Sequence, residues 1–205
     1  STYKEGEYKV IASNIPLTSF QDVGLANGET YDYVISAVNE NGEGFDSEPI
    51  AVTPAKVLIV AKEGASYRTV QEAINAVPDN STKRHVIYIK NGEYREKITI
   101  PKTKSNLSLV GESKEETVLV YQDNANTPGP DGNPLGTSKS SSMFIYANDF
   151  IAKNITIQND SGQGTGQAVA AYVQGDRAYF ENVRFLGYQD TLYTHQSRQY
   201  YQGCY

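Results

Sequence analysis

The sequence lacks tryptophan and has few of the residues that build metal or redox sites. Its 205 residues include one Cys, one Met, two His and no Trp. A single cysteine, Cys204, excludes an internal disulfide, and His85, His195 and Cys204 are too scattered to match a metal-ligand spacing. No apolar run approaches the roughly 18 residues of a membrane span, and no signal peptide begins the chain. We therefore expect no metal, no cofactor and no membrane partner.

The charge balance is mildly acidic. The chain has 18 Lys and Arg against 24 Asp and Glu, a formal net charge of −6. This balance argues against nucleic acid as the main partner, because a nucleic-acid surface needs an excess of positive charge. The 39% hydrophobic content suffices for a packed core, and 16 Tyr with 17 Gly favour strands and turns over helices. We expect an all-β protein.

The first 54 residues read as short strands separated by turns. The expected strands are residues 8–12, 18–23, 30–39 and 49–53. Leu25, Gly28 and Tyr31 resemble the corner before the sixth strand of a fibronectin type III domain, where a tyrosine hydroxyl bonds to upstream backbone. The earlier half of such a sandwich, with its buried tryptophan, is missing. Residues 1–54 are therefore expected to form a partial fibronectin type III-like module without chemistry, a spacer or adhesive element.

A second domain is expected over residues 55–205, with the boundary at Pro54-Ala55-Lys56. Thr69 and Glu72 form a capping-box pattern at the start of a short amphipathic helix that Pro78 ends. The apolar face of this helix consists of Val70, Ala73, Ile74 and Val77. Such a helix would cover the open end of a β-coil, whose backbone groups would otherwise attract another strand.

Apolar runs bounded by Gly, Asn, Asp and Lys then repeat without intervening helices. The expected strands are residues 85–89, 97–100, 107–110, 117–121, 142–146, 150–158, 168–173, 178–185 and 191–194. A sandwich would need frequent hairpin turns, yet Asn-Gly occurs in this region only at Asn91-Gly92. The pattern favours a right-handed parallel β-helix. Residues 123–142 are too polar and too rich in Pro and Gly for a coil, so they should form a surface loop, either contacting a ligand or flexible.

Two polar motifs stand in apolar surroundings. Gln189 and Asp190 lie side by side within the aromatic run Gly187–Tyr193. Gln167 lies in the small-residue run Gly166–Ala170, at a spacing that suits one turn of a parallel coil. Stacked coils would therefore bring the three side chains together in one cleft.

Four motifs in order resemble the successive signatures of pectin methylesterases. They are Gly92-Glu93-Tyr94-Arg95-Glu96, Gln167-Ala168-Val169-Ala170, the run Gly187–Tyr193, and Arg198-Gln199-Tyr200-Tyr201. The resemblance covers about residues 57–205. It implies an aspartyl esterase that removes methyl groups from the galacturonate units of pectin (homogalacturonan), secreted, monomeric and without cofactor.

The resemblance also assigns roles to residues. It implies that Asp190 is the general acid and later base, that Gln167 donates to the oxyanion, and that Gln189 supports the site. The nucleophile would be a second aspartate about one coil after Asp190, followed later by an arginine and a tryptophan. The sequence ends before this second aspartate and before the later arginine and tryptophan, and it begins without Met. We therefore expect a chain truncated at both ends and inactive as an esterase.

Ester hydrolysis by this route sets a condition on Asp190. It can act as the acid only if its pKa is raised, and burial between Tyr188, Leu192 and Tyr193 would raise it. The resemblance further suggests that Tyr172, Tyr193 and Ser142 contact substrate, because aromatic faces suit sugar rings.

Each candidate also has a structural interpretation. Asp190 could be a turn residue, Gln167 and Gln189 an amide ladder between coils, the two tyrosines packing residues, and Ser142 an ordinary loop serine. The Gly92–Glu96 motif is expected to be a structural turn anchored by its glutamate. His195 lacks the Gly-x-Ser-x-Gly elbow of a Ser-His-Asp triad.

Two other functions remain open. A β-helical pectin depolymerase would need calcium carboxylates or several acidic residues around one cleft, and the two glutamines would be unusual there. A non-catalytic polysaccharide-binding or adhesive solenoid would fit the fibronectin-like segment and the missing nucleophile, because fold alone does not fix function.

Overall fold

The computed structural model describes residues 2–3, 8–16, 20, 22, 25–26, 28–54 and 57–205. The chain divides into two compact units, Ser1–Lys56 and Val57–Tyr205. The strand expected at residues 18–23 lies largely outside the described residues, as do Ala55 and Lys56 of the expected boundary.

The first unit is built from short antiparallel strands. One sheet has the order β2 (Tyr8–Lys9), β1 (Thr2–Tyr3), β3 (Tyr31–Tyr33), β6 (Ile50–Val52), and a separate hairpin joins β4 (Val38–Asn39) to β5 (Gly42–Glu43). The Tyr31 hydroxyl accepts the backbone N–H of Ala26 at 3.0 Å, which is the contact expected of Tyr31. Ile50 and Phe45 are exposed, so apolar side chains of this unit face solvent.

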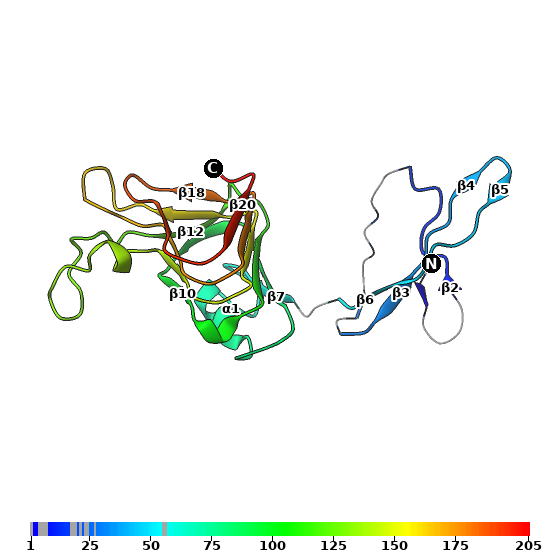
Figure 1. The fold of residues 1–205 in the computed structure, drawn as a ribbon, viewed down its shortest axis with the longest axis horizontal. Coiled ribbons are helices and arrows are strands. Elements are labelled where there is room, and N and C mark those ends of the chain that lie inside the picture. Colours follow the sequence, from blue (N-terminus) through cyan, green and yellow to red (C-terminus); the bar gives the residue numbers. More distant parts are fainter. Residues whose placement is uncertain are drawn as a thin grey trace. The chain divides into compact units, whose positions relative to one another are not determined.

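The second unit is a parallel β-helix with three walls (Figure 1). The first wall has the order β20 (Gln199–Gln202), β17 (Ala178–Glu181), β14 (Ile151–Lys153), β11 (Leu107–Gly111), β8 (His85–Ile89), β7 (Val57–Val60). The second is β18 (Arg184–Leu186), β15 (Thr156–Asn159), β12 (Thr117–Tyr121), β9 (Gly92–Arg95), and the third is β10 (Ile98–Ile100), β13 (Met143–Ile145), β16 (Ala171–Val173), β19 (Leu192–Thr194). Every pairing within the walls is parallel, because successive coils contribute one strand to each wall. The predicted parallel β-helix is confirmed.

Two expected strands are each a pair of strands. The apolar runs at residues 150–158 and 178–185 bend at Asn154 (φ 52°) and Asn182 (φ 55°). Asparagine tolerates the left-handed region better than most residues with a Cβ. The Asn182 side-chain amide also donates to the Asn154 side-chain oxygen at 2.7 Å, so the same corner is stacked from coil to coil.

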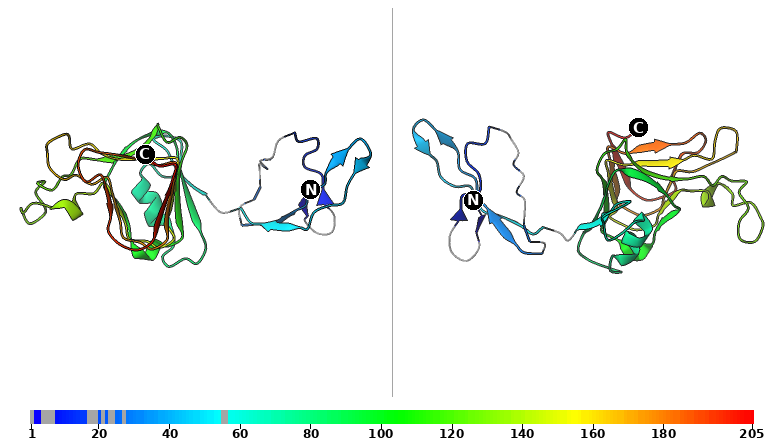
Figure 2. Two further views of the ribbon diagram at one scale, coloured as in Figure 1. Left: turned by 45° about the horizontal axis from the view of Figure 1, so that its top comes forward. Right: turned by 180° about the vertical axis from the view of Figure 1, so that it is seen from behind.

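The one α-helix among the described residues, α1 (Val70–Ala76), begins where the capping box predicted (Figure 2). The Thr69 hydroxyl accepts the N–H of Glu72, and the Glu72 carboxylate accepts the N–H of Thr69, both at 3.2 Å. Glu96 supplies the remaining acceptors: its carboxylate oxygens accept the N–H groups of Val70 at 2.8 Å and Gln71 at 2.9 Å. The Gly92–Glu96 motif is thus strand β9 rather than the expected turn, but its glutamate does serve as an anchor.

The core fills the inside of the coils. Phe150, Phe180 and Tyr201 stack along the axis, with ring centroids 5.9 Å and 4.8 Å apart. Burial raises the pKa of Tyr201, so its phenol stays neutral. The second unit also contains two short 3₁₀ turns within its described residues, η1 (Lys102–Lys104) and η2 (Thr137–Lys139).

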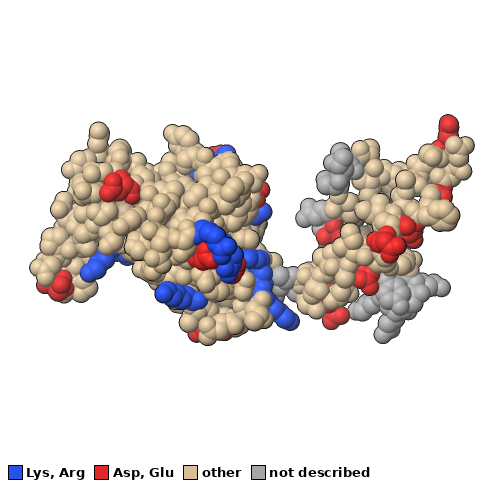
Figure 3. Space-filling view, viewed as in Figure 1, with Lys and Arg blue, Asp and Glu red and all other residues tan. Residues whose placement is uncertain are grey.

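Charged side chains of both signs are mixed on the face of the solenoid seen in Figure 3. At the turn that follows β16, the Asp176 carboxylate accepts from the Arg198 guanidinium (2.5 Å) and the Arg198 backbone N–H (3.0 Å). These bonds hold the pKa of Asp176 below its usual range. In the part of the chain that the structure describes, no helix is both long and apolar enough to traverse a bilayer.

Candidate active site

The outer face of the third wall carries a row of aromatic residues. Thr99, Phe144, Tyr172 and Tyr193 are aligned in register on β10, β13, β16 and β19. Phe144 and Tyr172 pack with Val169 in a cluster separate from the core. The Tyr172 ring lies 5.9 Å from Phe144 and 5.1 Å from Tyr193, centroid to centroid. Tyr172 and Tyr193, both expected to contact substrate, therefore lie together on the outer side of this wall, where Tyr172 is 8% exposed and Tyr193 is half-buried.

Two further rings, Tyr146 and His195, extend this row. Sequence reasoning did not place them at the substrate surface, and it considered His195 only for a Ser-His-Asp triad. Tyr146 lies 5.9 Å from Tyr172, and His195 lies 5.2 Å from Tyr172 and 5.7 Å from Tyr193. Burial raises the pKa of Tyr172, with smaller contributions from Tyr146 and Tyr193, so the hydroxyl of this ring stays neutral. The strand register could have located both residues in the sequence, because Tyr146 lies two positions after Phe144 and His195 lies two positions after Tyr193.

The segments of the two glutamines meet on adjacent coils. The Ala168 N–H donates to the Gln189 carbonyl at 3.0 Å, and the Ala170 N–H donates to the Thr191 carbonyl at 2.8 Å. Gln167, next to Ala168, is half-buried, whereas Gln189 is exposed. The backbone therefore places the Gln167 and Gln189 segments within one inter-strand spacing of each other, immediately before β16 and β19.

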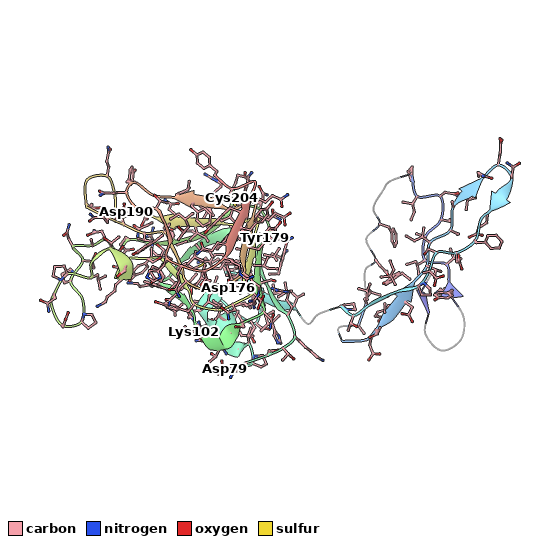
Figure 4. All side chains as sticks on the ribbon, viewed as in Figure 1. Asp79, Lys102, Asp176, Tyr179, Asp190 and Cys204 are labelled. Carbon is pink, nitrogen blue, oxygen red and sulfur yellow. The ribbon has the colours of Figure 1, made fainter. Side chains whose placement is uncertain are left out.

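Asp190 lies beside this contact but is not buried. Asp190 has φ 57° and an exposed side chain, and nearby Tyr188 is 65% exposed. The expected burial is wrong because β19 is the outer strand of its wall, so no strand of the described chain covers the turn before it. Figure 4 places Asp190 toward the side from which the long loop extends, away from Asp176 and Cys204. A left-handed aspartate is also compatible with a purely structural turn.

The three serines before β13 are buried. Ser140 and Ser141 have no exposed surface and Ser142 has 2%. The Ser142 hydroxyl donates to the Tyr121 carbonyl at 3.4 Å, and the Ser141 hydroxyl donates to the Met143 carbonyl at 2.7 Å. Ser142 thus has little surface free, since its hydroxyl is bonded to the end of β12, and its contact with substrate stays a prediction.

The long loop over residues 123–142 is anchored where it leaves and rejoins the coils. The Lys97 ammonium group pairs with the Asp123 carboxylate at 2.6 Å and donates to the Lys139 carbonyl at 2.9 Å. It also lies 5.6 Å from the centre of the Phe144 ring. The two ends of the loop are thus fixed beside the aromatic row, and contact of the loop with a ligand stays a prediction.

The outward positions of the four strands in this wall carry no carboxylate. Two carboxylates lie near the wall but outside its strands, the exposed Asp190 and Asp123, which is paired with Lys97. Across the described ranges, no three His, Cys, Asp or Glu side chains are grouped closely enough to hold a metal ion. The chemistry that this surface offers is therefore amide hydrogen bonding, one exposed carboxylate and aromatic contact.

Known proteins are similar to this chain in sequence and in fold. Residues 57–205 match the family model described as Pectinesterase. Pectinesterase 31 of Arabidopsis thaliana is 40% identical over 155 residues, covering 73% of this chain and 49% of that protein. Pectin methylesterase from carrot has a TM-score of 0.67 and 37% identity, covering 75% of this chain and 46% of that one.

A pectin methylesterase solved in complex with a hexasaccharide is 41% identical, with a TM-score of 0.60, over 66% of this chain and 44% of that one. The chain thus spans about half the length of these relatives. The match extends from the first strand of the β-helix to the last residue, so the chain belongs to the pectinesterase family.

Proposed function

We propose that this chain supplies the acid–base and oxyanion-binding part of an enzyme that removes methyl groups from pectin. The observation that carries the proposal is the Ala168–Gln189 backbone bond, which joins the Gln167 segment to the Gln189-Asp190 segment beside Tyr172 and Tyr193. An ester carbonyl seated there would lie near amide donors and an exposed carboxyl group. Family membership supports the same activity.

The reaction needs a nucleophile, a proton donor for the departing alcohol, and donors for the oxyanion. In the proposed route an aspartate attacks the ester carbonyl, Gln167 donates to the oxyanion, and Asp190 gives its proton to the departing methanol. Water then hydrolyses the acyl-enzyme, with Asp190 taking the proton from water. Removing one oxyanion donor typically costs about 2.7–4 kcal/mol of transition-state stabilisation. Gln189 supports the geometry from the neighbouring coil.

The nucleophilic aspartate has no counterpart among the outward residues Thr99, Phe144, Tyr172 and Tyr193. We propose that it belongs to a coil that follows β19 in the complete enzyme. Such a coil would also cover Asp190, and the burial that the acid role needs would come with it. The chain alone is therefore expected to bind substrate weakly and to release no methanol.

The substrate proposed is methyl-esterified homogalacturonan. An esterified galacturonate has no charge, so the neutral aromatic row of Tyr172, Tyr193 and Phe144 suits its sugar faces. The relative solved with a hexasaccharide supports an oligosaccharide ligand. We also propose that the enzyme is secreted, because pectin is an extracellular polymer. The expected monomeric state stays a prediction that light scattering would test.

A binding and turnover experiment tests the site. The isotopically labelled 205-residue chain is titrated with methyl-esterified hexagalacturonate while methanol and chain length are measured. We expect ring resonances of Tyr172 and Tyr193 and the Gln167 side-chain amide to shift, with no methanol. Unchanged resonances at all three residues would refute the site. Methanol release would refute the need for a second carboxylate, and shortened oligosaccharide would indicate a depolymerase.

For the first unit we propose a partial fibronectin type III-like module over residues 1–54, followed by the solenoid over residues 55–205. The supporting observation is the bond from the Ala26 N–H to the Tyr31 hydroxyl at the predicted corner. This module carries no candidate chemistry. Tyr31→Phe should lower the stability of this unit by about 1 kcal/mol, the usual contribution of one hydrogen bond, and an unchanged urea midpoint would refute the corner.

A further inference from the structure

The long loop is bonded to the segment that carries Gln167. The Ala125 N–H donates to the Gln167 carbonyl at 2.7 Å. The Asn126 side-chain amide donates to the Thr165 carbonyl at 3.0 Å. Between these two points lies Gly166, with φ 104°, where an added Cβ would come within 3.0 Å of the Asn126 amide nitrogen. The loop therefore packs directly on the backbone that precedes and includes Gln167.

A buried amide completes the attachment on the other side of Gln167. Asn159 is 1% exposed, and its side-chain nitrogen lies 2.7 Å from the Asp123 carbonyl and 3.0 Å from the Val169 carbonyl. The Val169 N–H donates to the Ser140 hydroxyl at 3.2 Å. The two ends of the loop, at Asp123 and Ser140, are thus joined to the residue that lies two positions after Gln167.

The segment before Gln167 needs such external contacts. Residues 161–166 include three glycines, Gly162, Gly164 and Gly166, all with positive φ. Glycine loses more conformational freedom on folding than any other residue. Within the described chain the segment belongs to no helix or strand. Its own bonds are local, from the Thr165 hydroxyl to the Gly162 carbonyl at 2.9 Å and from the Ser161 N–H to the Asn159 side-chain oxygen at 3.0 Å. The contacts from the long loop are therefore the ones that join the Thr165 and Gln167 carbonyls to another part of the chain.

We propose that Asn126 is a positioning residue for Gln167. The proposal rests on the proposed function, in which the Gln167 amide donates to the oxyanion. Catalytic donors must be held in place by supporting contacts, since a displacement of about 1 Å costs much of their effect. Asn126 does this from the loop: its amide fixes the Thr165 carbonyl, and with it the approach of the chain to Gln167. The loop acts as a scaffold for the site.

Hydrogen exchange in the 205-residue chain tests the positioning role. Asn126→Ala removes the bond to Thr165, and because Asn126 is exposed the fold should persist. We expect the protection factor of the Ala168 amide to fall about fivefold, the effect of one lost hydrogen bond. The Ala170 amide, bonded to Thr191 in the same wall, should keep its protection. Asn126→Asp, similar in size but without the donor amide, should behave like Asn126→Ala.

Asn133→Ala is the matched control. The Asn133 side-chain amide bonds only to Asp131 within the loop tip, at 3.0 Å, so its loss should leave Ala168 unchanged. A second readout is the Gln167 side-chain amide resonance during titration with methyl-esterified hexagalacturonate. We expect its response to be at least twofold weaker in Asn126→Ala and normal in Asn133→Ala. A purely structural role would not separate the two variants in this way.

The outcomes separate this inference from the proposed function. Unchanged protection of Ala168 in both Asn126 variants would overturn the inference, as would an equal loss in Asn133→Ala. If protection falls in Asn126→Ala but the unmodified chain shows no response to the oligosaccharide, the proposed function fails while the positioning role of Asn126 is supported.

Discussion

Removing the Glu96 carboxylate should destabilise the β-helix more than removing any exposed glutamate. Glu96 is half-buried, and its two oxygens accept the N–H groups of Val70 and Gln71 at 2.8 Å and 2.9 Å. These are two of the first N–H groups of α1, which have no partner within the helix. The capping-box side chains of Thr69 and Glu72 accept each other's backbone N–H groups, so they do not replace Glu96 as acceptors for Val70 and Gln71.

The magnitude follows from these contacts. Leaving a donor unsatisfied costs about 1–3 kcal/mol, and a negative charge at a helix N-terminus contributes about 0.3–1 kcal/mol. Because solvent reaches part of the site, we take the lower values and expect Glu96→Ala to cost about 2–3 kcal/mol. Glu96→Gln keeps one good acceptor and should cost about 1 kcal/mol.

Urea unfolding followed by tyrosine fluorescence measures the effect, since the chain has 16 Tyr and no Trp. With a slope of about 2 kcal/mol/M, the midpoint for Glu96→Ala should fall by about 1–1.5 M without a change of slope. Glu93→Ala is the control, because Glu93 lies three residues before Glu96, on strand β9, and makes an exposed pair with Arg95 at 3.2 Å. Equal midpoints for the two variants would refute the anchoring role of Glu96.

Two further predictions concern packing and pH. Gly175→Ala should lower the free energy of unfolding by about 3 kcal/mol, because the new Cβ would lie 1.8 Å from the Ala147 carbonyl oxygen. Gly164→Ala is the control: Gly164 has φ 79° and open space around it, so the cost should be about 1 kcal/mol. Equal costs in urea unfolding would contradict the close contact at Gly175. Because Arg198 lowers the folded-state pKa of Asp176 below the unfolded value of about 3.9, its stabilisation is complete above that pH and is lost as pH falls. In the Asp176→Asn variant the urea midpoint should therefore fall less than in the unmodified chain between about pH 5 and pH 3. An equal fall of the midpoint in both proteins would count against the pairing of Asp176 with Arg198.

The sequence predicted the elements whose signals are local. The capping box at Thr69 and Glu72 gave the start of α1, and the apolar runs located the strands of the β-helix. It missed the corners at Asn154 and Asn182, because a single left-handed residue turns the chain without interrupting the apolar run. Stacking of identical corners between coils is a long-range property that no single window of sequence shows.

The site was predicted in part. The meeting of the Gln167 and Gln189 segments follows from coil spacing, and the backbone bond between Ala168 and Gln189 agrees with it. The burial of Asp190 could not be read from its apolar neighbours, because its left-handed φ and the outer position of β19 leave it exposed. The burial of Ser142 could not be read from sequence either, because a small hydroxyl residue suits an inward position as well as an outward face.

The way the long loop is attached has a practical consequence for protein engineering. Its bonds to the coils are made by residues 123–126 and by residues 139–140, whereas residues 129–133 bond mainly to one another. The distal part is therefore a suitable place to insert a fluorophore or an affinity tag, since the inserted group would leave the bonds that hold the loop to the coils in place.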